Sequence, residues 1–427
     1  MKFPLFLAAL LLPLGVLHAQ DNSFTAGADL LQRGELRLGG TAQGSATEGD
    51  MAAFILGRTR LNLSYQWKDR IESCVTAQYS GTWGSTGALS LFEGWVQFNI
   101  GKGFFIKAGR QNLSYDDQRI FGSDDWSMTG LSHDGLKLGY EGYGHKVHLF
   151  GAFNQNPANI AGGTYYTGGL QPYKGMAALW YHYDFQTFPL GASLLAMDAA
   201  MQGGEQDVDE ITRHQQIMGG YLNFHPGRWK VEAAGYYQMG SNEDGIPIQA
   251  WMASGKTAFT PSSALNIYAG YDFLSGDEHF ATPSGGMIGL IRHDAIRGFS
   301  SIYGSHHKFY GAMDFFYVST YFNGFTPGLQ NAFVGAQWKP IPALALNASY
   351  HFLATAVKLE NADMPLGHEV ELSASYNFLP NLSLSAGYSF MHGTETMEVL
   401  KRSSDHHRLH WGWIMLRYAP RFLQTKW

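Results

Sequence analysis

Apolar and polar residues alternate along several stretches of this chain. In positions 369–378 every second residue is apolar, and positions 71–79, 344–352 and 382–390 follow the same pattern. Successive side chains of a β-strand point to opposite faces, so the alternation predicts strands with one apolar and one polar face.

The predicted strands are long for a soluble protein. They run for about 10 to 14 residues, whereas strands of soluble sheets average about 5 or 6. Aromatic residues lie near the ends of the apolar faces, as in the girdles of membrane barrels, and short polar connections alternate with long ones. We therefore predict an all-β, antiparallel transmembrane β-barrel of about 18 strands, with short periplasmic turns and long extracellular loops, rather than a soluble β-sandwich or propeller.

One stretch disturbs this order of connections. If positions 308–318 formed a strand, the strand number would be odd and a short turn at 339–342 would fall on the outer face. Phe309, Met313 and Phe316 also recur at spacings nearer a helix than a strand. We therefore expect a single outer excursion over 276–328, with an ordinary strand at 308–318 as the alternative.

The excursion is too aromatic to remain in water, so we expect it to fold back and narrow the lumen. Lys308 and Asp314 would then face the conduit or the opposing wall, with Arg292 nearby on the same loop.

The N-terminus indicates export from the cytoplasm. Lys2 precedes an uncharged apolar run that ends at a small residue, Ala19. This pattern predicts a signal peptide at 1–19 and a single barrel domain at 20–427. A barrel of this kind belongs in the bacterial outer membrane, surrounded by outer-membrane lipid. We expect it to be monomeric and to be delivered by periplasmic chaperones and the barrel-assembly machinery.

The composition supports a membrane barrel and disfavours other classes. Charged residues make up only 15% of the 427 residues, against about 25% in ordinary soluble chains. The net charge of −6 disfavours a nucleic-acid partner. The single cysteine, Cys74, excludes an intrachain disulfide. The chain has no Gly-x-Ser-x-Gly elbow, and its paired histidines lack the spacing of a structural zinc site, so we expect no enzyme activity, metal or cofactor.

A charged motif connects two predicted strands over positions 109–135. We expect Arg110 and Arg119 to be held there by Asp116, Asp117 or Asp134. The paired guanidinium groups would then be oriented donors for carboxylate ligands, or a salt-bridge network that only fixes the loop.

Arginines on the polar face of a further predicted strand complete the candidate conduit. Arg58 and Arg60, with Arg110 and Arg119, should bias permeation toward anions, because local charges set the field in a pore. The full set of candidate conduit residues is Arg58, Arg60, Arg110, Asp117, Arg119, Asp134, Arg292, Lys308 and Asp314.

The blocks at 115–122 and 307–317 resemble the alginate export family of outer-membrane barrels, in the form found in Bacteroidetes-type bacteria. Weaker similarity extends over most of the mature chain, and the sequence departs from the family pattern at Asn112 and Leu131. The resemblance implies a barrel of around eighteen strands with a positively lined conduit for an anionic polysaccharide.

These observations favour a channel for passive diffusion of an anionic polysaccharide or oligosaccharide, an alginate-like polyuronate in export or uptake. A general or small-solute porin is the alternative within the same class. An outer-membrane enzyme or a surface adhesion barrel is the alternative from another class.

Overall fold

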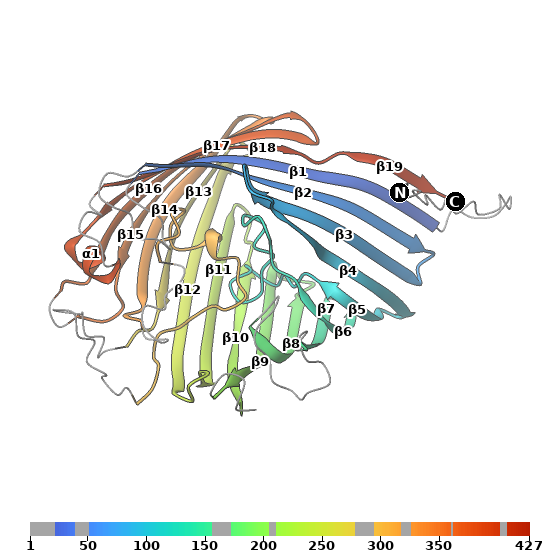
Figure 1. Cartoon of the computed structure of the whole chain (residues 1–427), viewed down its shortest axis with the longest axis horizontal. Coiled ribbons are helices and arrows are strands. Elements are labelled where there is room, and N and C mark those ends of the chain that lie inside the picture. The colour runs from blue at the N-terminus through green and yellow to red at the C-terminus, as the bar shows by residue number, and fades with distance from the viewer. Residues whose placement is uncertain are drawn as a thin grey trace, which may run out of the picture.

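The computed structural model describes residues 22–38, 51–155, 172–204, 211–277, 294–316, 326–359, 362–401 and 408–427. The predicted signal peptide and Arg292 lie outside these ranges. The described strands form one antiparallel sheet that closes on itself (Figure 1). Their bounds are β1 Asn22–Leu38, β2 Met51–Trp67, β3 Ile71–Thr82, β4 Ala88–Gly101, β5 Phe104–Gln111, β6 His133–Gly142, β7 His145–Phe153, β8 Tyr173–Asp184, β9 Leu190–Gly203, β10 Ile211–Phe224, β11 Trp229–Ser241, β12 Pro247–Ser262, β13 Leu265–Leu274, β14 Leu329–Ile341, β15 Leu344–Ala354, β16 Pro365–Leu379, β17 Leu382–Gly393, β18 Leu409–Tyr418 and β19 Arg421–Lys426.

Closure depends on β1, which pairs with β2 on one side and with both β18 and β19 on the other. Leu30 lies opposite Tyr418 in β18, and Gly27 lies opposite Arg421 in β19. The interruption falls at Pro420, which has no N–H to give to a ladder. The wall is therefore an eighteen-strand barrel with one extra strand that continues its last position, and the predicted strand number is confirmed.

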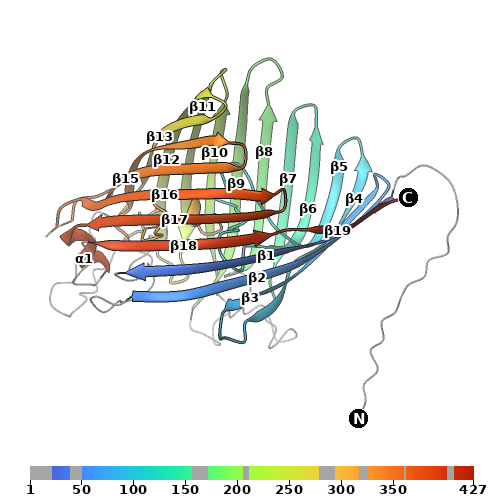
Figure 2. The same ribbon diagram turned by 90° about the horizontal axis from the view of Figure 1, so that it is seen from above.

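The connections alternate as the sequence predicted. Two-residue turns such as 102–103, 143–144 and 380–381 lie at one end of the barrel, and the long excursions between β5 and β6 and between β13 and β14 leave the other end. The first and last strands run side by side at the short-turn end (Figure 2), where Asn22 and Trp427 exchange backbone hydrogen bonds.

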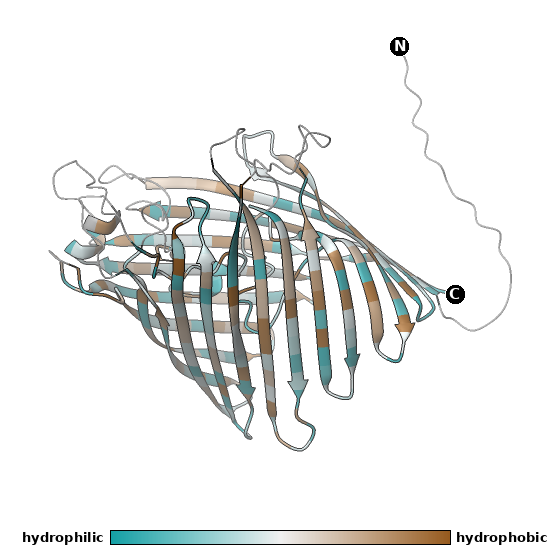
Figure 3. Ribbon diagram, turned by 90° about the horizontal axis from the view of Figure 1, so that it is seen from below, coloured by the Kyte–Doolittle hydropathy of each residue, from teal (hydrophilic) through white to brown (hydrophobic). Residues whose placement is uncertain are grey.

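Side chains alternate between the two faces of the wall, which Figure 3 shows as alternating bands of hydropathy along the strands. On β16, Val370 and Leu372 are 40% and 51% exposed and point outward toward lipid, whereas Glu369, which precedes Val370, is 1% exposed and points inward. This arrangement confirms a barrel with an apolar outer face.

The inner face is not polar all round. From β8 to β12 a continuous part of the inner face is made of buried apolar side chains, which are Met176, Ala178, Leu195, Met197, Ala199, Ile217, Ala234, Tyr236, Ala250 and Met252. Over this part the strands are apolar on both faces, which the alternation of the other strands did not predict. We call this part of the wall the apolar sector. Contact between this apolar surface and a water-filled lumen would be unfavourable, so another part of the protein is expected to cover the surface.

Two loops cover the apolar sector. Loop A (112–132) follows β5, and loop B (the described residues 294–316) lies between β13 and β14; both run inside the ring of strands in Figure 1. Phe121 of loop A stacks on Tyr303 of loop B at 5.9 Å, and both belong to one buried cluster with the apolar sector. One loop folded into the lumen was expected, and a second accompanies it.

Loop B contains no strand in its described residues, which confirms that Lys308–Phe316 is not part of the wall. Its regular structure is one short 3-10 helix, η1, at His306–Lys308. Met313, Phe315 and Phe316 are each at most 2% exposed. Between β17 and β18 lies the seven-residue α-helix α1, Glu395–Lys401. No helix in the described part of the chain is long and apolar enough to cross a membrane.

Replacing Ile217 by lysine tests whether the apolar sector needs its cover. Ile217 is 1% exposed on the inner face, so the new charge would be buried without a partner, at a cost of at least about 3 kcal/mol. We expect displaced loops, read as higher single-channel conductance and a lower temperature at which the folded band disappears in cold gel electrophoresis. Ser385→Lys, on the polar part of the inner face, is the control and should change neither value much.

Candidate functional site

Arg119 is the point at which both loops meet the wall. Its guanidinium group is 5% exposed and pairs with Asp117 of loop A at 3.1 Å and with Asp272 of β13 at 3.1 Å. It also donates to the Tyr310 hydroxyl of loop B at 2.8 Å and lies over the Phe309 ring at 4.0 Å. One side chain thus orients two loops against one strand, through charged hydrogen bonds that are directional.

A second ionic cluster holds the later part of loop A, around Asp125, against β2. The Asp125 carboxylate pairs with Arg58 at 3.1 Å and with Arg60 at 2.7 Å, and Arg417 of β18 lies 3.9 Å away. Burial alone would raise the pKa of Asp125, but the three arginines offset this and hold it below the ordinary value of 3.8. The stabilisation is therefore complete above that ordinary value and disappears as the pH falls through the lowered pKa.

Aromatic stacking joins the loops beside this cluster. The Trp126 ring of loop A lies between the Arg33 guanidinium group of β1, at 3.9 Å, and the His307 ring of loop B, at 4.0 Å. His307 in turn bonds to Asp314 at 2.9 Å. Asp314 therefore serves the internal packing of loop B.

Two carboxylates of β16 hold the tip of loop B. Glu371 accepts the backbone N–H of Ala312 at 2.7 Å, and Glu369 accepts that of Met313 at 2.9 Å. Gly311 precedes them with a φ of 92°, and a Cβ there would lie 2.2 Å from Glu369. Only glycine suits this close approach.

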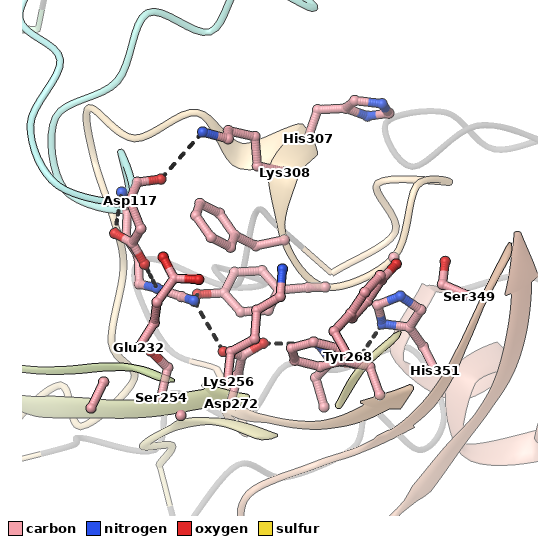
Figure 4. Close-up of a pocket in the computed structure, with 18 of the residues that line it drawn as sticks. Asp117, Glu232, Ser254, Lys256, Tyr268, Asp272, His307, Lys308, Ser349 and His351 are labelled. Carbon is pink, nitrogen blue, oxygen red and sulfur yellow. Dashed lines mark hydrogen bonds and ion pairs between the residues drawn. The ribbon is translucent and has the colours of Figure 1, made fainter. Parts of the chain in front are cut away.

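The loops leave a cavity of about 430 Å³ against the inner faces of β10–β16 (Figure 4). It is lined by charges of both signs: the acids Asp116, Asp117, Glu232, Asp272 and Glu371, and the bases Arg119, Lys230, Lys256 and Lys308. The aromatic rings of Tyr268, Phe309 and Phe333 complete the lining.

Every acid of the cavity is engaged within the protein. Asp117 and Asp272 bind Arg119, and Glu371 binds loop B and Ser349. Glu232 accepts the Tyr221 hydroxyl at 2.5 Å and pairs with Lys230 at 2.9 Å. Asp116 accepts from Ser193 and Trp180; burial raises the pKa of its carboxyl group.

Two bases of the cavity are not engaged in this way. In the part of the chain that the structure describes, Lys256 and Lys308 have no carboxylate partner. Lys256 points from β12 toward the segment that carries Lys308 (Figure 4). The Lys308 ammonium group reaches only the Asp117 carbonyl oxygen, at 3.4 Å, and burial lowers its pKa. Lys256 and Lys308 are therefore the cations of the cavity that no carboxylate contacts, although its five acids outnumber its four lysine and arginine side chains.

The structure brings most of the sequence-predicted residues together. Arg58, Arg60, Asp117, Arg119, Lys308 and Asp314 all lie on the two loops or on the wall that they touch.

Arg110 and Asp134 pair with each other at 2.6 Å, as expected, but on the outer face of the wall. Their neighbours Gln111 and His133 are buried and point inward, so this pair points outward and does not line the lumen.

Sequence reasoning missed Asp125 as the partner of Arg58 and Arg60, and it missed Lys256 altogether. Lys256 lies on the inward period of its strand, which was the available signal. Among the described residues no three His, Cys, Asp or Glu side chains are grouped in a way that could hold a metal ion.

Comparison with known proteins assigns the architecture. The model of the "Gram-negative porin" family matches residues 20–396. No curated protein sequence matches the chain. The family that matches is not the alginate export family, and the resemblance proposed from loop motifs is not supported.

Solved structures of Pseudomonas aeruginosa channels are similar in fold. OpdL is 12% identical with a TM-score of 0.60, and the match covers 94% of this chain and 99% of that one. OccK9 (OpdG) is 14% identical with a TM-score of 0.60, covering 93% and 98%. OprD is 13% identical with a TM-score of 0.58, covering 93% and 96%. At this identity the likeness concerns the fold alone.

Replacing Asp125 by asparagine tests whether the ionic cluster holds loop A in the lumen. The change removes the carboxylate partner of the buried Arg60, whereas Arg58 keeps Asp29 at 3.3 Å, so we expect a cost of about 3 kcal/mol or less. We expect higher and noisier conductance in planar bilayers and earlier thermal loss of the folded band.

Asp134→Asn is the matched control, because it breaks an arginine pair on the outer face. A partly exposed pair of this kind contributes less than about 1 kcal/mol. Equal effects of the two variants would contradict the assignment of the Asp125 cluster as the fastening point.

Proposed function

This chain belongs to the Gram-negative porin family, and on that premise we propose that it is a diffusion channel for small solutes that carry a carboxylate, such as uronate sugars and their short oligomers. The family places it in the bacterial outer membrane as a non-enzymatic channel, which confirms the location and the class predicted from the alternating strands.

The observation that supports an anionic solute is the unequal engagement of charges in the cavity. Its five acids are bound to protein donors, whereas Lys256 and Lys308 have no carboxylate partner among the described residues. Burial disfavours the charged form of Lys308 in the empty cavity. An arriving carboxylate would offset that cost, so these two lysines favour contact with an anionic group.

The size of the passage favours a short solute over a long polymer. Loops A and B fill the space next to the apolar sector and leave a cavity of about 430 Å³. A cavity of this size suits one or two sugar rings, and the Tyr268, Phe309 and Phe333 rings offer faces on which sugars can lie.

Passage in this proposal is passive. Lysines along a wet path lower the barrier for a carboxylate without holding it tightly, which allows the solute to leave as well as enter. The direction is then set by the concentration difference across the membrane. A general porin for small solutes is the second candidate, favoured by the mixed signs of charge on the cavity wall.

Replacing both lysines by glutamine separates the two candidates. We expect Lys256→Gln/Lys308→Gln to shift the reversal potential under a potassium glucuronate gradient toward cation preference, because two ammonium groups without a carboxylate partner are removed. The control is Lys102→Gln/Lys339→Gln, which removes two exposed lysines near the short turns. Wild-type channels without anion preference, unchanged by the cavity variant, would favour the general porin.

A further inference from the structure

Two lysines lie side by side on the inner face of the wall, on neighbouring strands beneath loop A. Lys107 of β5 and Lys137 of β6 are direct partners in the antiparallel register. Leu136 and Leu138, on either side of Lys137, are 46% and 42% exposed on the outer face, so Lys137 points inward, and Lys107 opposite it does too. Lys137 is only 8% exposed.

Like charges directly opposite one another destabilise a sheet. Such a pair is normally relieved by a carboxylate between the two ammonium groups. In the described part of the chain, no carboxylate forms an ion pair with either lysine.

The acids nearest the pair are turned to other donors. Glu93 accepts the Trp95 indole N–H at 3.2 Å and the Asn112 backbone N–H at 3.3 Å. Glu141 bonds to His148 at 3.0 Å. Glu72 accepts from Asn99 at 3.2 Å. Glutamates therefore lie near the two lysines, but their carboxylate oxygens accept hydrogen bonds from other groups.

Aromatic rings position both ammonium groups. Lys107 lies 3.4 Å from the centre of the Trp95 ring, and Lys137 lies 5.5 Å from that of Tyr115 in loop A. Ring faces attract a cation but do not neutralise its charge. The two charges are thus held in place on the inner face without an ion-pair partner among the described residues.

We propose that Lys107 and Lys137 form a second oxyanion site on the lumen wall, one that binds a carboxylate of a passing solute between the two ammonium groups. The site is separate from the cavity of Lys256 and Lys308, because β7–β9 lie between Lys137 on β6 and the first strand that lines the cavity, β10. Tyr115 touches the second site, and the next residue, Asp116, lines the cavity, so loop A separates the two.

The inference deepens the proposed function, because it rests on an anionic solute, but it requires different residues. A solute that leaves one lysine pair would meet another before reaching open water. A second weak site along the path lowers the barrier between sites without tight binding at either.

The test is block of potassium chloride current in planar bilayers by glucuronate and, separately, by inorganic phosphate. In Lys107→Gln/Lys137→Gln we expect the concentration for half-maximal block to rise roughly tenfold, as expected for losing a charged hydrogen bond. Lys107→Arg/Lys137→Arg should keep the block. Lys102→Gln/Lys339→Gln is the control of equal charge change.

Each outcome decides the proposal. Block by glucuronate that is lost in the glutamine variant and kept in the arginine variant supports it; block by phosphate alone makes the site one for inorganic oxyanions and overturns the solute assignment. Unchanged block, with a more heat-stable folded band, would mean that the lysines only repel each other, and it also overturns the proposal. The single variants Lys107→Gln and Lys137→Gln replace the double variant if it does not fold.

The cavity variant distinguishes this inference from the proposed function. If Lys256→Gln/Lys308→Gln leaves ion preference unchanged while the Lys107 and Lys137 variant loses block, the cavity assignment fails and the second site stands. If ion preference shifts in the cavity variant but block persists without Lys107 and Lys137, the second site alone fails.

Discussion

A closed wall of eighteen strands encloses more space than its own inward side chains can fill. In this protein part of the inner wall is also apolar, from β8 to β12, and would face water if the lumen were open. The contact between this apolar sector and loops A and B is therefore the constraint on which the interior depends. It places both loops inside the barrel, confines the water-filled space to the remaining wall, and makes the narrowing a permanent part of the folded state.

The ionic groups have a different task from the apolar ones. Buried ion pairs add little net stability, because desolvation offsets much of the attraction, yet removing one partner is costly. Arg119 and Asp125 each bind groups from separate elements in directional geometry. They determine which position of each loop lies against which strand, while the apolar contact supplies the driving force. The acids of the lumen are thereby used to position the loops.

Much of the fold could be predicted from the sequence because its rules are local. Period-two alternation marks the strands, short turns mark one end, and the failure of both rules at 308–318 marked loop B as an excursion. Contacts between distant segments could not be predicted in the same way: Arg60 and Asp125 are 65 positions apart. Arg110 was wrongly assigned to the lumen, although the alternation predicts otherwise. Lys107 and Arg110 are three positions apart on β5, so their side chains lie on opposite faces of the strand, and Lys107 is the one that points inward. Loop motifs also misled the family assignment, because any barrel that carries inserted loops needs glycines, aromatic residues and paired charges in them.

The net charge of the chain consequently says little about the ions that it favours. The formal charge is −6, but a carboxylate paired with arginine presents little net field to a solute, and one that accepts from a hydroxyl or a backbone N–H has its oxygens occupied by protein donors. A solute meets the groups that the fold leaves open, and in the described cavity the ammonium groups without a carboxylate partner are Lys256 and Lys308. An acidic protein can in this way offer ammonium groups to an anionic solute, because many of its acids are engaged in holding the loops.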